Sequence, residues 1–143
     1  QVMSESDFVS VHCPLSAKTR GMIGEKQIAM MKPEAIFISA ARGGIHDEVA
    51  LERALANGRI AGVGLDVFED EPPHYDHPIL AYPNTIVSPH NAGITSDCLY
   101  NMALCAAEQW VEVFSGCKPS LVINSEVWGK YCDRFEKIFG KRP

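Results

Sequence analysis

The chain has 143 residues, of which 46% are apolar and 22% are charged, a length and composition typical of one globular domain. Its net charge of −5 argues against a nucleic-acid partner, because a face that binds nucleic acid normally carries a basic stripe. No apolar run reaches the ~18–20 residues needed to cross a bilayer, so we expect no membrane partner.

Apolar runs rich in β-branched residues alternate along the chain with segments in which apolar residues recur at helical spacing. Such alternation predicts β-α-β units and a parallel α/β sheet whose strands end at one edge. The second apolar run is apolar nearly throughout, as in a strand covered on both faces. In chain order we expect strand 7–13, helix 19–31, strand 35–41, helix 47–56, strand 60–68, strand 85–88, helix 96–115 and helix 127–139.

Three chemically active residues follow the predicted strands. Arg42 ends the second strand run, Glu71 follows the third and His90 ends the fourth. In open α/β sheets, reactive groups gather beyond the carboxyl ends of the strands. We therefore expect these three residues to form one site, although they lie far apart in the sequence.

An arginine, a carboxylate and an imidazole suit a substrate such as a 2-hydroxy acid. The planar fork of Arg42 can grip a carboxylate or a polarised carbonyl with two parallel hydrogen bonds. His90 can exchange the hydroxyl proton near neutral pH, and Glu71 beside it would fix its tautomer and favour its charged form. The hydride of such a reaction needs a cofactor, because no side chain accepts one.

Each of the three residues also has an ordinary structural explanation. Arg42 can cap a helix or pair with Asp47 or Glu48 on the surface. Glu71 belongs to an acidic run, and such runs are usually solvated. His90 can be a loop histidine that satisfies backbone groups.

Asp66 stands inside an apolar strand run, where an unpaired carboxylate is costly. It must therefore have a partner in the folded chain. The structural alternatives are a backbone amide or Arg59, and the functional alternative is an amide of a ligand.

The glycines do not form a dinucleotide-binding loop. Gly62-Val63-Gly64 is a Gly-x-Gly pattern, but valine stands at position 67 and no helix follows directly. Gly43-Gly44 lies at a strand-to-helix turn, where it can give a ligand access to the backbone or simply form a tight turn.

Cysteine and histidine usage predicts neither disulfides nor a metal site. The five cysteines are an odd number without close pairs, which favours free thiols in the cytoplasm. His74 and His77 lie three residues apart in a proline-rich loop with no further ligand nearby, so we expect a solvated loop.

Five segments together resemble the NAD-dependent D-2-hydroxyacid dehydrogenase family, which includes phosphoglycerate dehydrogenase. The resemblance runs from about residue 7 to residue 116, and the segments are specific in combination. They are His12-Cys13-Pro14-Leu15, Thr19 with Gly21, Ala41-Arg42-Gly43-Gly44, Asp66-Val67-Phe68-Glu69-Asp70-Glu71-Pro72 and Ser88-Pro89-His90.

This resemblance implies an oxidoreductase that interconverts a D-2-hydroxy acid and its 2-keto acid with NAD, NADP remaining open. It implies His90 as acid/base, Glu71 as its partner and Arg42 as the substrate-binding arginine. Glu71 favours hydroxy acids over formate, because related formate dehydrogenases typically have glutamine there. By analogy, a homodimer is expected. Cofactor contacts are implied for Cys13, Pro14, Ala40, Ala41, Arg42, Asp66, His90 and Gly93.

The family's Gly-x-Gly-x-x-Gly loop, its acidic ribose-binding residue and most of its substrate domain have no counterpart in this sequence. We therefore expect residues 1–116 to be the C-terminal half of a Rossmann-type doubly wound sheet with an exposed apolar edge. Residues 117–143 would be a tail returning toward a substrate domain. On this view the chain is part of a protein about twice as long and is inactive alone.

Some positions depart from the family pattern, and other functions remain open. His46 stands where a small apolar residue is common, 39–41 lacks the usual asparagine, and Asn91-Ala92-Gly93 follows the histidine where an apolar residue is common. The alternatives are a non-catalytic dehydrogenase-like binding module, such as an NAD sensor or co-repressor, and an inactive truncation product.

Overall fold

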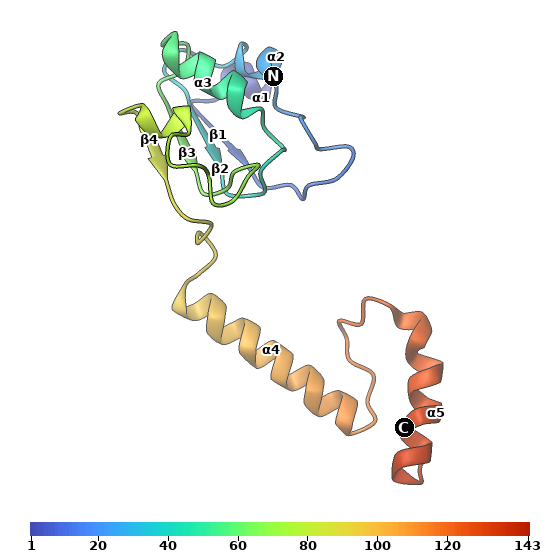
Figure 1. The fold of residues 1–143 in the computed structure, drawn as a ribbon. Helices are drawn as coiled ribbons and strands as arrows, with labels where there is room; N and C mark the ends of the chain where they lie inside the picture. Colours follow the sequence, from blue (N-terminus) through green and yellow to red (C-terminus); the bar gives the residue numbers. More distant parts are fainter. The chain divides into compact units, whose positions relative to one another are not determined.

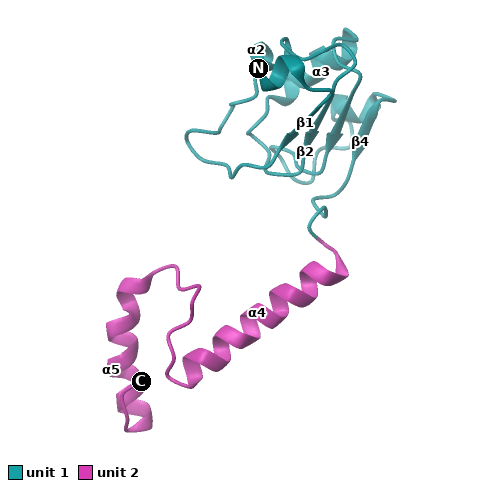
Figure 2. Ribbon diagram, turned by 180° about the vertical axis from the view of Figure 1, so that it is seen from behind, with its two compact units in different colours: residues 1–93 teal, residues 94–143 magenta.

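The computed structural model describes all residues from 1 to 143 and divides them into two compact units. Unit 1 comprises Gln1–Gly93 and unit 2 comprises Ile94–Pro143 (Figure 2). None of the helices combines the length and apolar character that a membrane crossing requires.

Unit 1 is built on a parallel sheet of four strands in the order β1-β2-β3-β4 (Figure 1). The predicted parallel sheet is therefore confirmed, although each strand is shorter than the apolar run that predicted it. Since the strands are parallel, their carboxyl ends share one edge. The strands are β1 (Phe8–Val11), β2 (Ile36–Ser39), β3 (Gly62–Leu65) and β4 (Thr85–Val87).

Short helices precede and connect these strands. The longest of them, α3, begins where the Asp47 side chain accepts a hydrogen bond from the Ala50 N–H at 3.0 Å, an ordinary N-cap. The helices of unit 1 are α1 (Val2–Glu5), α2 (Glu25–Ile28), α3 (Glu48–Ala56) and the 3-10 helix η1 (Pro78–Ala81).

The predicted helix over 19–31 is wrong in its first half. Gly21 has a φ of 64°, in the left-handed region that interrupts a right-handed helix. Ile23 lies extended and forms a β-bridge with His46, donating its N–H to the Ile45 carbonyl at 3.1 Å. Only α2 remains helical, because a pairing distant in sequence replaces the local helix.

The core of unit 1 covers one face of the sheet. Val9, Phe37 and Val63 are register partners on neighbouring strands, and each is at least 94% buried. On the other face Phe8 is 66% exposed and Ile86 is 79% exposed. On this face of β2, Ile36 and Ile38 are only partly buried, so the expected cover of 35–41 on both faces is incomplete. An edge position for the first strand agrees with the expected apolar edge.

Unit 2 consists of helices and the turns between them. The side chain of Thr95 caps α4 by accepting from the Cys98 N–H at 3.1 Å, and no residue of α4 is buried. In α5, by contrast, Cys132 and Phe135 are buried. Both predicted helices are confirmed as α4 (Ser96–Phe114) and α5 (Trp128–Phe139), with the 3-10 helix η2 (Ser125–Val127) before α5.

Candidate active site

Glu71 and His90 form a close pair beyond the carboxyl ends of β3 and β4. The distance from His90 Nδ1 to Glu71 Oε2 is 2.7 Å. An ionised carboxylate can only accept a hydrogen bond, so Nδ1 must carry the proton and Nε2 is left for another partner. This arrangement suits a histidine that exchanges protons through Nε2.

Glu71 is held in its ionised form by its surroundings. Its other oxygen, Oε1, accepts a hydrogen bond from the Phe68 N–H at 3.0 Å. The hydrogen bond from His90, followed by that from Phe68, lowers the pKa of Glu71, and the positive charges of His90 and Arg42 add to this effect. Within the acidic run, Glu71 therefore pairs with His90, whereas Glu69 pairs with Arg20.

Arg42 follows β2 but contacts neither member of this pair through a hydrogen bond. Its Nη1 donates to the carbonyl of its neighbour Ala41 at 2.6 Å, and the side chain is exposed. Neither the helix cap nor the pairing with Asp47 or Glu48 that the sequence left open is present. The guanidinium is thus free to bind an anion.

Asp66 lies directly after β3 and is buried. It accepts hydrogen bonds from the Ser88 hydroxyl at 2.5 Å, the Asn91 N–H at 2.8 Å and the Ala92 N–H at 3.0 Å. Burial opposes ionisation of Asp66, but these hydrogen bonds outweigh it and lower the pKa. The partners of Asp66 are therefore two backbone amides and a hydroxyl group. Arg59, the other candidate partner, donates to the Ala29 carbonyl instead.

Most of the residues singled out in the sequence line one of two cavities. A cavity of about 260 Å³ contains Asp66, Glu71 and His90 in its wall. Arg42 lines a second cavity of about 580 Å³, together with Cys13, Pro14, Ala40 and Ala41. Gly93 lines neither cavity.

Gly43 brings the loop that carries Arg42 against the loop that carries Glu71. A Cβ atom on Gly43 would lie 1.8 Å from the Phe68 carbonyl oxygen, so no larger residue fits without a backbone shift. From the sequence, Gly43-Gly44 could either give a ligand access to the backbone or form a tight turn. The sequence indicated no role for Phe68 or Ser88. Only the Arg-Gly-Gly sequence could have hinted at this close approach.

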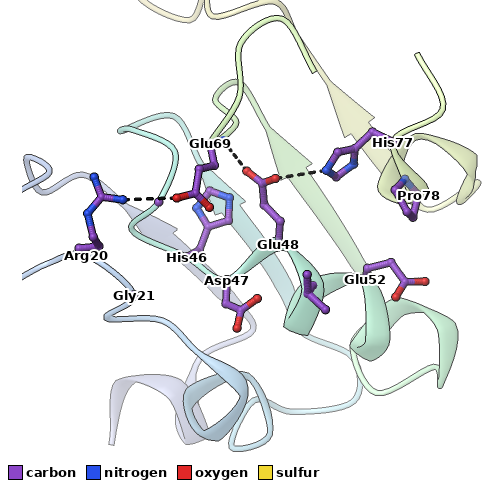
Figure 3. Close-up of a pocket in the computed structure, with 11 residues that line it drawn as sticks. Arg20, Gly21, His46, Asp47, Glu48, Glu52, Glu69, His77 and Pro78 are labelled. Carbon is purple, nitrogen blue, oxygen red and sulfur yellow. Dashed lines mark hydrogen bonds and ion pairs between the residues drawn. The ribbon is translucent and has the colours of Figure 1, made fainter. Parts of the chain in front are cut away.

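A pocket of about 410 Å³, lined mainly by charged residues and histidines, lies beside these loops and contains none of Arg42, Glu71 and His90 (Figure 3). Glu48 connects its walls, since Oε1 accepts from the Glu69 N–H at 2.6 Å and Oε2 lies 3.2 Å from His77 Nε2. His77 is thus half-buried, which contradicts the expected solvated loop at this residue, whereas His74 is exposed beside Asp76.

His46 also lines this pocket, but its ring nitrogens are buried and have no hydrogen-bond partner (Figure 3). Burial lowers the pKa of His46 to about 4, against a smaller opposing effect of Asp47. The ring packs against Phe37 with a centroid separation of 5.6 Å. His46 is therefore a neutral core residue.

Comparisons with known proteins identify the family to which the chain belongs. Residues 1–92 match the family described as D-isomer specific 2-hydroxyacid dehydrogenase, NAD binding domain. The chain is 43% identical over 126 residues to glyoxylate/hydroxypyruvate reductase B of Klebsiella pneumoniae subsp. pneumoniae, an alignment that covers 88% of this chain and 39% of that protein. The chain therefore spans about two fifths of the length of this curated relative.

Two solved structures share the fold. One is D-lactate dehydrogenase with NAD⁺ from Lactobacillus jensenii, with a TM-score of 0.79 and 36% identity over 85% of this chain and 41% of that one. The other is a D-isomer specific 2-hydroxyacid dehydrogenase from Xanthobacter autotrophicus Py2 in complex with NADPH and MES, with a TM-score of 0.72 and 37% identity over 83% of this chain and 48% of that one. This chain belongs to the D-isomer specific 2-hydroxyacid dehydrogenase family, and its residues 1–92 match the NAD binding domain of that family.

Proposed function

We propose that this chain supplies the acid/base pair of an NAD-dependent D-2-hydroxyacid dehydrogenase, with His90 as acid/base and Glu71 as its partner. The observation that carries this proposal is the 2.7 Å contact between His90 Nδ1 and Glu71 Oε2 at the shared strand edge. It gives His90 a fixed tautomer and leaves Nε2 available for a substrate oxygen.

In the reducing direction, His90 donates a proton from Nε2 to the carbonyl oxygen of a 2-keto acid as that oxygen becomes a hydroxyl. In the oxidising direction, the same nitrogen takes the hydroxyl proton back. Glu71 stabilises the imidazolium, because its carboxylate is ionised and bonded to Nδ1. Arg42 binds the substrate carboxylate or carbonyl with its unpaired guanidinium.

A nicotinamide cofactor, when bound, supplies or accepts the hydride of this reaction. The cavity of about 580 Å³ suits a flat ring, because small side chains of Cys13, Ala40 and Ala41 line it. Asp66 has one of its roughly four lone-pair sites left to accept from an amide. We propose NAD as the cofactor and keep NADP as an alternative, since the solved relatives include both kinds of complex.

The wider organisation follows as part of the same proposal. We assign 1–116 to the NAD-binding domain and 117–143 to a tail of the substrate domain. The partners are a small 2-hydroxy or 2-keto acid and a second copy of the protein. The five free cysteines support a cytoplasmic location.

The test is an NADH absorbance assay on the protein as its own cells make it, with glyoxylate and hydroxypyruvate first because a relative is named for them. His90→Ala should lower kcat about 10²–10⁴-fold, the usual contribution of a general acid/base. The matched control is His74→Ala, which removes an exposed histidine outside the site and should leave kcat unchanged.

Full activity in His90→Ala would overturn the acid/base assignment. An intact protein that binds NADH but turns over no 2-keto acid would instead support a non-catalytic binding module.

A further inference from the structure

We propose that Asp66 is a positioning residue that fixes the direction of His90 by anchoring the main chain on both sides of it. The inference deepens the function proposed above and rests on it. No contact of Asp66 with a substrate is needed, because its effect passes through the loop that carries His90.

The sheet places the Asp66 carboxylate beside this loop. Asp66 follows β3 and Ser88 follows the neighbouring β4, and the Ser88 N–H continues the strand pairing by donating to the Leu65 carbonyl at 2.9 Å. The Ser88 hydroxyl then donates to Asp66 Oδ1 at 2.5 Å. The chain is therefore fixed two residues before His90.

The same carboxylate fixes the chain directly after His90. The Asn91 N–H donates to Oδ1 at 2.8 Å and the Ala92 N–H donates to Oδ2 at 3.0 Å. Both oxygens are thus engaged, and Asp66 bridges the two ends of a short turn with His90 between them.

The backbone of His90 shows why such an anchor is needed. Its φ of 52° lies in the left-handed region, and it is the one residue other than glycine with positive φ in the chain. This conformation costs roughly 1–2 kcal/mol for a residue with a side chain. A left-handed residue also turns the following N–H groups into a concave anion-binding arrangement, and here the anion is the Asp66 carboxylate.

The left-handed turn is what directs the imidazole to Glu71. Without the carboxylate, the turn would relax toward an extended conformation and the 2.7 Å contact between His90 and Glu71 would no longer be enforced. Since one lone-pair site of Asp66 remains free, a contact with the cofactor and the anchoring of His90 are separable roles.

The experiment compares Asp66→Asn with Asp70→Asn, an exposed neighbour with no hydrogen bond to this loop, in the protein as its own cells make it. The amide group of asparagine cannot accept from Asn91 and Ala92 with both of its terminal atoms. We expect faster amide hydrogen exchange in the peptide spanning 88–93, and about a 10²-fold fall in kcat, as for a catalytic group misplaced by about 1 Å.

A second variant, Ser88→Ala, keeps the two backbone bonds and removes only the hydroxyl. It should also speed exchange in 88–93 and lower kcat, but by less than Asp66→Asn. It keeps the proposal testable if Asp66→Asn does not fold. Unchanged exchange in 88–93 together with a weakened affinity for NADH would overturn the proposal and leave Asp66 as a cofactor contact. The exchange measurement does not depend on turnover, so it decides the anchoring role even if the proposed function fails.

Discussion

Both units contain regularly spaced apolar residues, but unit 1 buries them in a core, whereas α4 of unit 2 buries none. In unit 1 the apolar positions of β1, β2, β3 and α3 bury one another around Phe37, which is fully buried. In unit 2 the longest helix of the chain, α4, has no buried residue, and Leu99, Met102 and Trp110 are each more than half exposed. Helical periodicity thus predicts that a helix forms, but it does not say what covers the apolar side chains.

The two units also differ in how their secondary structure is stabilised. The strands of unit 1 depend on pairing with segments 20–30 residues away along the chain. The α4 helix depends on local hydrogen bonds and its N-cap, with contacts near its end such as that of the Tyr131 hydroxyl with the Val113 carbonyl. Loss of packing should therefore harm unit 1 far more than unit 2.

The largest difference is expected for truncation of apolar side chains. Phe37→Ala should lower the free energy of unfolding of unit 1 by about 3–5 kcal/mol, because it leaves a cavity in the core. Leu99→Ala in α4 should change stability by less than about 0.5 kcal/mol, because the side chain is 53% exposed.

Amide hydrogen exchange, read separately in peptides of the two units, measures both effects. A cost above ~2 kcal/mol for Leu99→Ala would show that α4 is covered in solution, as the proposed homodimer or a further domain would do.

Glycine positions give a second contrast. Gly43→Ala should destabilise unit 1 by about 3 kcal/mol or more, since its Cβ would overlap the Phe68 backbone. Gly129→Ala in α5 meets no atom within 4 Å and should stabilise this helix by up to ~1 kcal/mol. Thermal unfolding followed by circular dichroism compares the two variants, and equal effects would contradict the close approach of the two loops.

Much of the sheet could be predicted because its strands coincide with β-branched runs. The segment 19–31 could not, because Ile23 pairs with His46 and that partner lies 23 residues further along the chain. Likewise, Phe37 and Ile38 are both apolar, so the sequence of the run at 35–41 does not reveal which of them faces the core. Both errors concern contacts between segments, which local patterns do not contain.

The candidate site shows the same limit. Parallel strands must end at one edge, so a meeting of Glu71 and His90 could be expected from their positions alone. The sequence also required a partner for the buried Asp66, but Ser88, Asn91 and Ala92 become visible as partners only when the loop folds back. The positive φ of His90 was not predicted from the sequence, because few residues other than glycine adopt it, although histidine does so more often than most.

His46 makes the stability of unit 1 depend on pH in a way that unit 2 should not share. Its pKa is about 4 in the folded chain against 6.5 as the ordinary value, so between these pH values only the unfolded chain binds the proton. The free energy of unfolding should therefore fall by up to roughly 3 kcal/mol as the pH drops from 6.5 to 4.

His46→Leu should remove this dependence and leave unit 1 at least as stable at pH 7, because two unpartnered ring nitrogens disappear. His74→Leu, at an exposed histidine, is the control. Exchange rates of the β2 and β3 amides measured at pH 7 and pH 4.5 give the comparison. An unchanged pH dependence in His46→Leu would show that another group controls it.

The smallest expected effects concern the helix caps, and here the two units should lose a similar free energy of unfolding. Asp47→Ala removes the acceptor for the Ala50 N–H in unit 1, and Thr95→Ala removes that for the Cys98 N–H in unit 2. Each should cost about 1 kcal/mol, because each leaves an N–H of the first turn without its partner.

The two helices should nevertheless respond differently to the loss of the cap. The α3 helix is held by its buried residues and should stay folded, whereas α4 has no buried residue and should lose helical content at its N-terminus. Exchange in peptides covering 47–56 and 95–104 measures both, and equal fraying of the two helices would mean that packing protects α3 less than its burial indicates.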